Sequence, residues 1–328
     1  MRKLLFFFGL FLIALWFLTR PVPVPADIAY GVTFSIPYAR DTLALDWKKT
    51  YAGILDELKA RHLRLPAYWT EIEKERGKYD FSGLDYLVGE AGKRNAEIIL
   101  AVGEKLPRWP ECFVPDWAGT LSREERHKVF LNFIDRVIER YRGDKHIVYW
   151  QVENEPFLPF GGCTDYDKYF VDVEISRVKS LDSRPVIVTD SGELSLWAQA
   201  YKRADVFGTT MYRTVSIKFI ENFKYPLPPG YFRMKARLMR YIFGEKPIIV
   251  VELQAEPWTK KRPPEVSIDT QMKLMNVGIF KDNINYEKET GFGEVYLWGV
   301  EWWYWLKEKH GKPELWDEAK KLFNGGRS

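Results

Sequence analysis

The chain has 328 residues, of which 46% are hydrophobic, so it can bury a large core and accommodate an α/β barrel of about 250 residues. Its 49 Lys and Arg residues nearly balance its 45 Asp and Glu residues, and the two signs are interspersed, as in Arg123-Glu124-Glu125-Arg126. Such mixing is typical of solvated helix faces, and it argues against nucleic acid as a partner.

The first residues have the pattern of a membrane or export signal. Arg2 and Lys3 precede an apolar run over residues 4–18. That run fits the apolar region of a secretory signal, and with its flanks it approaches the roughly 20 residues of a spanning helix. The best cleavage candidate, Val24-Pro25-Ala26, lies far from the run, which favours an uncleaved signal anchor over residues 1–20. A Pro-rich extended spacer over 21–27 follows. Either form of signal predicts that residues 28–328 lie outside the cytoplasm.

From residue 28 onward, strand and helix patterns alternate eight times. Apolar, β-branched runs predict strands over 29–35, 62–66, 96–102, 147–152, 185–189, 206–210, 248–251 and 295–299. Amphipathic patterns predict helices over 47–60, 81–94, 123–141, 166–181, 194–203, 232–243, 270–288 and 315–323. Eight such units predict one (β/α)₈ barrel over residues 28–328. A doubly wound nucleotide-binding sheet uses the same units, but the chain has neither a G-x-G-x-x-G turn nor a Walker loop.

Polar residues gather where the predicted strands end. A carboxylate at the exit of a buried strand is costly unless it has a partner or a chemical task. In a barrel these positions ring one mouth, where the loops leading to the helices carry the active site. The residues at these strand ends are Arg64, Asn154, Glu155, Tyr212, Glu252 and Trp298.

This set resembles the clan A glycoside hydrolases, the superfamily of retaining β-glycosidases on (β/α)₈ barrels, over roughly residues 28–305. Asn154-Glu155-Pro156 after the fourth strand and Glu252 after the seventh carry the resemblance, together with the stretch 68–81, which looks like the clan's W-x-x-x-E-x-x-x-G-x-Y-D-F loop. The resemblance implies that Glu155 is the acid/base and Glu252 the nucleophile, about 5–5.5 Å apart. Thr210 stands where some families of the clan have His, so no family within the clan is assigned.

The resemblance also implies roles for the neighbouring residues. Arg64 and Tyr212 would favour the charged form of Glu252, Asn154 would hold the sugar 2-hydroxyl, and Trp298 would floor the subsite of the attacked sugar. Loop aromatic residues are candidates for further sugar subsites, although each can instead pack the core. These candidates are Trp69, Trp109, Trp117, Phe157, Trp258, Trp302 and Trp303.

Cys112 and Cys163 follow consecutive predicted strands, in neighbouring loops. An oxidising compartment would let them form a disulfide, and the alternative is two unrelated buried thiols. The four His residues are scattered without ligand spacing, so we expect neither a metal site nor a cofactor.

We therefore expect a retaining glycoside hydrolase that cleaves β-glycosidic bonds in an extracytoplasmic oligo- or polysaccharide. A transglycosylase would use the same two carboxylates with a sugar in place of water. Two other interpretations stay open: a non-catalytic glycan-binding barrel held at the membrane, and an unrelated barrel enzyme such as an isomerase or lyase.

Overall fold

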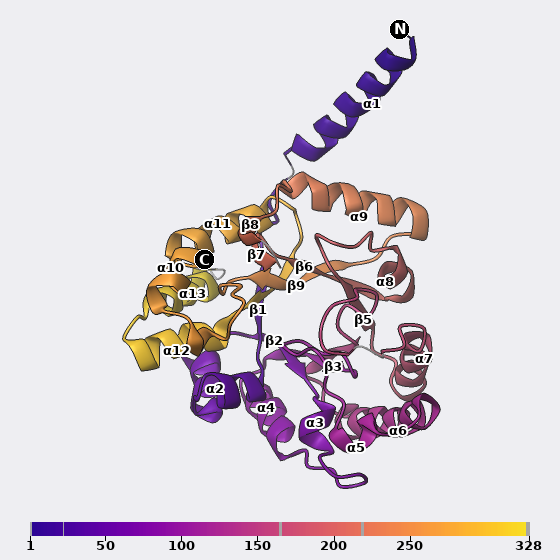
Figure 1. Cartoon of the computed structure of the whole chain (residues 1–328), viewed down its shortest axis with the longest axis vertical. Coiled ribbons are helices and arrows are strands. Elements are labelled where there is room, and N and C mark those ends of the chain that lie inside the picture. Colours follow the sequence, from indigo (N-terminus) through magenta and orange to yellow (C-terminus); the bar gives the residue numbers. More distant parts are fainter. Residues whose placement is uncertain (1, 22, 164–165, 218–219, 326–328) are drawn as a thin grey trace.

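The computed structural model describes residues 2–21, 23–163, 166–217 and 220–325. Over these residues eight parallel strands close into a barrel in the order β1-β10-β9-β6-β5-β4-β3-β2 (Figure 1). The predicted (β/α)₈ barrel is thus confirmed. Its strands are β1 (Ala29–Thr33), β2 (His62–Pro66), β3 (Glu97–Val102), β4 (Ile147–Val152), β5 (Val186–Asp190), β6 (Val206–Met211), β9 (Ile248–Gln254) and β10 (Glu294–Trp298).

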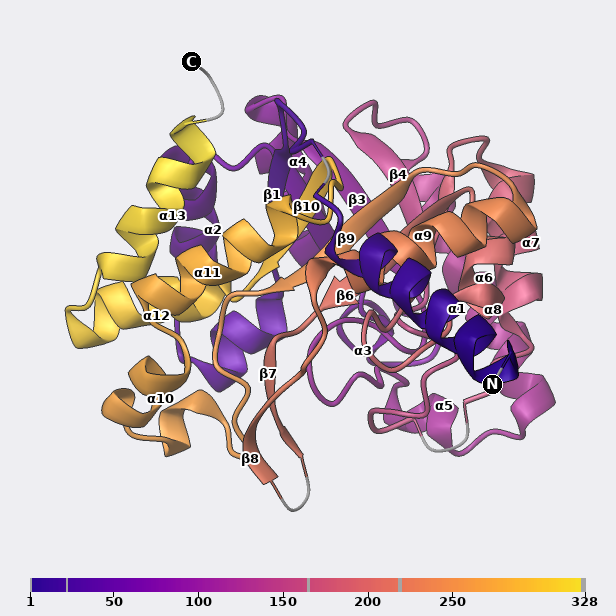
Figure 2. The ribbon, with the colours of Figure 1, turned by 90° about the horizontal axis from the view of Figure 1, so that it is seen from above.

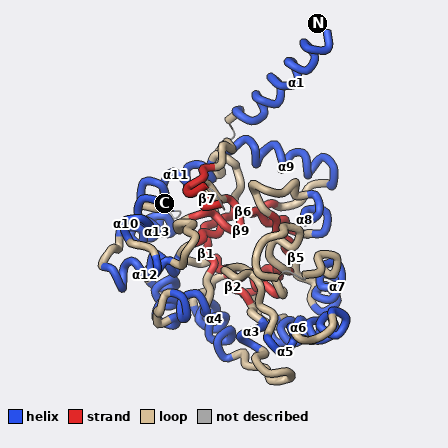
Figure 3. Tube along the Cα trace, in the orientation of Figure 1, coloured by secondary structure: helices blue, strands red, loops and turns tan. Residues whose placement is uncertain are grey.

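Helices surround the barrel on all sides (Figures 2 and 3). The long helix α6 shows why they form where they do, because Ser122 and Glu125 make a capping box at its start and its buried side chains recur on one face. The helices that cover the strands are α2 (Trp47–Asp56), α4 (Ser82–Lys93), α6 (Arg123–Tyr141), α7 (Val171–Leu181), α8 (Ala198–Arg203), α9 (Pro229–Phe243), α11 (Val277–Lys288), α12 (Val300–His310) and α13 (Glu314–Gly325). Shorter turns are α3 (Trp69–Ile72), α5 (Asp116–Gly119), α10 (Ile268–Leu274), the π-helix η1 (Tyr38–Thr42) and the 3₁₀-helix η2 (Pro263–Glu265).

The strands are buried on both faces, as the continuous apolar runs indicated. Every residue of β9 is buried, for example. Because successive side chains of a strand point to opposite faces, one set packs against the helices and a smaller set fills the barrel interior. The interior set comprises Ile99, Ile187, Val206, Ile249, Val251 and Tyr296.

Three elements differ from the sequence-based expectation. The expected loop after β6 contains an antiparallel hairpin, β7 (Thr214–Ile217) and β8 (Ile220–Lys224). The expected helix 270–288 is divided into α10 and α11, because the Asn276 side chain accepts the Ile279 N–H and starts a new helix. Helix α12 was not predicted, because residues 300–306 are all buried and the sequence there lacks the alternation of apolar and polar faces that marks a surface helix.

Helix α1 (Arg2–Thr19) projects away from the barrel beside α9 (Figures 1 and 2). Apolar side chains along it are exposed, including Leu5 at 63% and Phe7 at 65%. Within the described part of the chain, no helix combines the length and apolarity that crossing a membrane requires. The N-terminal anchor therefore stays a prediction.

Candidate active site

Arg64 of β2 is the centre of a polar network inside the barrel mouth. Its side chain is fully buried, and its guanidinium donates through three nitrogens to three side chains and, more weakly, to the Val251 carbonyl at 3.3 Å. Nη1 donates to Glu252 Oε1 at 2.8 Å, Nη2 to Asn154 Oδ1 at 2.6 Å and Nε to Gln151 Oε1 at 2.8 Å. The rigid fork of an arginine thereby links the ends of β2, β4 and β9. These contacts bring together the predicted site residues Arg64, Asn154 and Glu252. They also add Gln151, which the sequence did not mark as a site residue.

Glu252 is surrounded by donors. Besides the Arg64 contact, its Oε2 accepts the Tyr212 hydroxyl at 2.8 Å. A neighbouring cation and a hydrogen-bond donor both stabilise the charged form of a carboxyl group. In turn, burial and the negative charge of Glu252 raise the pKa of Tyr212 well above its usual value, so this hydroxyl keeps its proton. The backbone of Tyr212 is held by Glu193, whose Oε1 accepts its N–H at 2.7 Å.

Glu155 lies in a different environment. Its Oε1 accepts a hydrogen bond from the neutral Thr210 hydroxyl at 3.2 Å. Burial raises the pKa of Glu155 well above its usual value, and the charges of Glu252 and Glu111 raise it further, against the weaker effect of Lys105. A carboxyl group in these surroundings holds its proton and can donate it.

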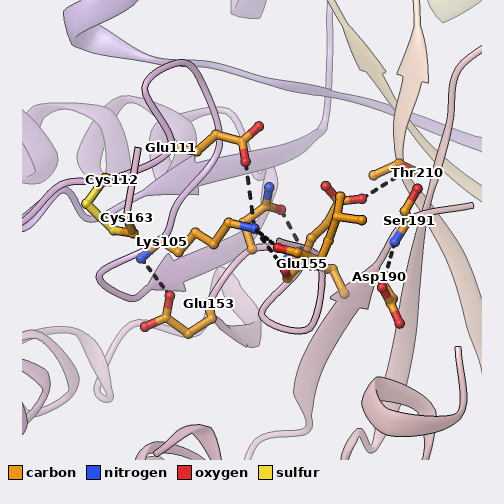
Figure 4. Close-up of polar contacts among 12 residues, drawn as sticks. Lys105, Glu111, Cys112, Glu153, Glu155, Cys163, Asp190, Ser191 and Thr210 are labelled. Carbon is orange, nitrogen blue, oxygen red and sulfur yellow. Dashed lines mark hydrogen bonds and ion pairs between the residues drawn. A yellow bond between two sulfur atoms is a disulfide. The ribbon is translucent and has the colours of Figure 1, made fainter. Parts of the chain in front are cut away.

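The backbone that carries Glu155 turns sharply after β4. Glu153 and Glu155 have φ values of 59° and 46°, a left-handed conformation that is costly for residues other than glycine. The turn is held from several sides: the Glu155 N–H donates to Thr189 Oγ1 at 2.8 Å, and Lys105 Nζ donates to the Glu155 and Leu158 carbonyls at 2.9 and 3.0 Å. Figure 4 shows the Lys105 side chain reaching between Glu111 and Glu155.

Glu153 points away from Glu155 (Figure 4). Its two oxygens accept the backbone N–H groups of Glu104 and Lys105 at 2.8 and 2.6 Å, and burial raises its pKa to about 8. Glu153 therefore fixes the loop after β3 instead of contacting the site. Glu153 and Glu155 are two positions apart and would point to the same side within a strand. They point in different directions because β4 ends at Val152, before both residues.

A disulfide joins Cys112 and Cys163, with an Sγ–Sγ distance of 2.09 Å. It connects the loops after β3 and β4, which also meet through a hydrogen bond from the Gly162 N–H to the Pro110 carbonyl at 2.7 Å. The joined loops place Glu111 near Glu155 and Glu252, with its Oε2 3.9 Å from Lys105 Nζ. Glu111 is thus a third carboxyl group beside the site, and burial raises its pKa to about 7.

Trp298 lies at the end of β10, with 8% of its surface exposed. The Arg108 guanidinium covers one face of its ring, 4.0 Å from the centroid, and the Tyr38 ring lies at the same distance from that guanidinium. Arg108 is also paired with Glu256 and Glu301. One face of Trp298 is thus occupied by protein, and its role as the floor of a sugar subsite stays a prediction.

Trp69 and Trp302 were candidates for sugar subsites, with core packing as the alternative, and the structure shows core packing. Both side chains are fully buried. Trp69 packs against Phe130 and Phe133 of α6, and its Nε1 donates to Glu73 Oε2 at 2.7 Å. Trp302 donates to Gln271 Oε1 at 2.7 Å. Their polar atoms are satisfied inside the protein, so neither can form a sugar platform.

Four other aromatic side chains form a row across the loops at the mouth, which we call the aromatic row. Tyr212 lies 4.9 Å from Trp258, Trp258 lies 6.0 Å from Phe160 and Phe160 lies 6.2 Å from Trp109, measured between ring centroids. Exposure along the row reaches 39% at Phe160 and 70% at Trp109. The row therefore leads from the hydroxyl that contacts Glu252 out to solvent.

Sequence reasoning missed Lys105, Glu111 and Arg108 as parts of the site. All three lie in one loop after β3, and the signals near them were Trp109 and Cys112. As for metals, the described residues contain no group of three or more His, Cys, Asp or Glu placed to hold an ion.

Comparison with known proteins finds similarity to β-galactosidases. The model of a β-galactosidase family, Glyco_hydro_42, matches residues 46–183. The β-galactosidase BgaA of Clostridium cellulovorans is 24% identical over 174 residues, which are 47% of this chain and 26% of that protein. For the β-galactosidase LacA of Lactobacillus acidophilus the identity is 25% over 244 residues, which are 67% and 33% of the two chains. The chain thus spans a quarter to a third of the length of these relatives.

Among solved structures, a Bacillus circulans β-galactosidase aligns with a TM-score of 0.60 and 15% identity, over 91% of this chain and 56% of that one. The GH5_18 protein of Bifidobacterium longum aligns with a TM-score of 0.65 and 13% identity, over 92% and 80% of the two chains. At such identities the likeness concerns the fold. Together with the family-model match over residues 46–183, it supports the resemblance to clan A of the glycoside hydrolases that the sequence indicated.

Proposed function

We propose that this protein is a retaining β-glycosidase in which Glu155 is the acid/base and Glu252 the nucleophile. The observation that carries the proposal is the contrast between the two carboxyl groups. Arg64 and Tyr212 stabilise the charge on Glu252, whereas burial and neighbouring carboxylates raise the pKa of Glu155. A double displacement at an anomeric carbon needs one carboxylate and one carboxylic acid.

In the first step the Glu252 carboxylate attacks the anomeric carbon while Glu155 gives its proton to the glycosidic oxygen. The bond to the leaving group breaks, and a covalent glycosyl-enzyme forms. In the second step Glu155, now a carboxylate, takes a proton from water, whose oxygen attacks the anomeric carbon and releases Glu252. If a sugar hydroxyl takes the place of water, the same residues catalyse transglycosylation.

Neighbouring residues support the two steps. Asn154 Oδ1 is engaged by Arg64, which directs the amide N–H group of Asn154 toward other partners, and we assign it to the sugar 2-hydroxyl. Lys105 holds the strained turn that presents Glu155. The aromatic row offers faces on which further sugar rings can stack, which suits an oligo- or polysaccharide substrate. The related proteins bear the name β-galactosidase, so a β-galactoside is the first substrate to test.

We also propose that the barrel acts outside the cytoplasm. Two basic residues precede the apolar α1, and the Cys112–Cys163 disulfide suits an oxidising compartment. Cell fractionation tests the location, and the intact mass of the recovered protein tells an uncleaved anchor from a cleaved signal. Recovery of the reduced protein in the cytoplasm would refute this part of the proposal.

The catalytic proposal is tested by following the hydrolysis of β-linked oligosaccharides, beginning with β-galactosides, by NMR. We expect the β-anomer of the product to appear first, and we expect Glu252→Gln to abolish turnover. Glu124→Gln is the matched control, because Glu124 lies exposed in the first turn of α6, on the outside of the barrel. First appearance of the α-anomer would exclude retention. Glycan binding without products from the wild type would indicate the non-catalytic barrel.

A further inference from the structure

The outer face of α9 is apolar where a barrel helix is normally polar. Leu238, Tyr241 and Ile242 are 50%, 90% and 54% exposed, and their spacing places them on one side of the helix. The opposite side, with Phe232 and Met239, is buried against the barrel. A surface helix that is apolar on both sides requires a second apolar environment for its outer side.

The charges beside this outer face are basic. Arg237 is exposed and Arg240 is partly exposed, and the Arg240 Nε lies 3.1 Å from the Glu245 carboxylate. Aromatic and aliphatic side chains flanked by arginine are typical of helices that lie in the headgroup region of an anionic bilayer, where tyrosine is also favoured.

Helix α1 meets α9 in the first half of α9 and from there projects away from the barrel (Figures 1 and 2). The two helices are joined by a hydrogen bond from Arg233 Nη2 to the Arg20 carbonyl at 2.6 Å, and the Arg237 guanidinium lies 5.3 Å from the centroid of the Phe17 ring. Apolar side chains farther along α1 are exposed, such as Phe11 at 60%. Two neighbouring helices therefore present apolar side chains on one side of the molecule.

A second copy of the chain would fit this face less well than lipid does. In a two-fold contact centred on α9, Arg237 and Arg240 would approach their own counterparts, and like charges repel. Anionic headgroups instead complement these arginines. We propose that the outer face of α9, made of Leu238, Tyr241 and Ile242, rests in the interfacial region of an anionic lipid bilayer. A barrel helix runs alongside the sheet, so this docking leaves the catalytic mouth open to the side.

The test uses the full chain with a single reporter. No cysteine is free within the described residues, so Tyr241→Cys can be labelled with an environment-sensitive fluorophore. The control is Glu124→Cys, because the Glu124 side chain is exposed. It belongs to α6, a helix on the side of the barrel away from α1 and α9 (Figure 1). Each labelled protein is reconstituted into vesicles of phosphatidylcholine with or without phosphatidylglycerol, and with brominated lipids as quenchers.

We expect the label at 241 to shift to shorter wavelength and to be quenched severalfold more than the label at 124, with a larger difference on anionic vesicles. Equal quenching of the two labels would overturn the proposal. A blue shift at 241 without vesicles, together with a dimeric mass by light scattering, would also overturn it and would identify a second copy as the occupant. The variant Arg237→Gln separates headgroup attraction from apolar contact, and it should reduce the effect of phosphatidylglycerol while leaving enzymatic turnover unchanged.

Discussion

The ends of β4 and β9 carry the same residue type in opposite surroundings. At the end of β9, Glu252 receives hydrogen bonds from a buried guanidinium and a tyrosine hydroxyl. At the end of β4, Glu155 has a threonine hydroxyl on its carboxyl group and other carboxylates nearby, and its pKa is raised. Under the proposed mechanism, the difference between the acid and the nucleophile therefore lies in the neighbours of the two carboxyl groups and not in the side chains themselves.

The largest effect is expected from Glu252→Gln, which keeps the shape and the hydrogen-bond acceptor but removes the nucleophilic charge. We expect kcat/KM to fall by ~10⁴-fold or more, because the covalent path is lost. Steady-state kinetics on a β-glycoside measure the loss, and the thermal unfolding midpoint checks that the barrel is intact. Activity within tenfold of the wild type would remove Glu252 from the mechanism.

Glu155→Gln is expected to reduce kcat/KM by ~10²- to 10⁴-fold for substrates with poor leaving groups. Because the pKa of Glu155 is raised, its acid form persists to higher pH, and wild-type activity declines as the pH rises through that pKa. The variant should lack this alkaline decline. The measurement is the pH profile of kcat/KM, and an unchanged alkaline limb in the variant would assign that limb to another group.

Arg64→Met removes the cation on which the contrast depends, and it leaves Glu252 buried without its charge partner. We expect the free energy of unfolding to fall by about 3–5 kcal/mol, because the remaining charge stays buried without a partner to offset its desolvation cost. Denaturant titration measures this change. In the Glu252→Gln background the same substitution should cost less, and equal costs would show that the two residues are not coupled.

Tyr212→Phe tests the second donor to Glu252. Loss of one hydrogen bond to a charged group costs about 1.5–3 kcal/mol, so we expect kcat/KM to fall by roughly 10- to 100-fold. Tyr51→Phe is the matched control, because it removes another buried hydroxyl, which donates to the Leu87 carbonyl at 3.0 Å between α2 and α4. A loss equally large in the control would point to a general packing effect.

The smallest effect is expected from Trp109→Ala at the solvent end of the aromatic row. Loss of one stacking face should cost about 1 kcal/mol, or roughly a fivefold rise in KM, for long oligosaccharides alone. The measurement is KM as a function of substrate length. A uniform loss for short and long substrates would place Trp109 outside any extended subsite.

By itself the sequence determined the barrel and both carboxylate positions. A buried parallel strand needs a continuous apolar, β-branched run, and Glu155 and Glu252 interrupt such runs at the place where a barrel presents its loops. Arg64 was found in the same way, because a charge inside an apolar run is visible without tertiary information. The contacts of Arg64 with Asn154 and Glu252 bridge 90 and 188 positions and follow from closing the barrel.

The tertiary structure alone decided which residues surround these positions. Trp69 and Trp302 are hidden in the core although their sequence context allowed a loop role, because a tryptophan pattern does not tell a helix that packs inward from one that faces the mouth. Lys105 and Glu111 enter the site through a loop held by a disulfide and by the strained turn after β4. Irregular loops have no periodicity to read, so their contacts emerge only when the strands that carry them are fixed in space.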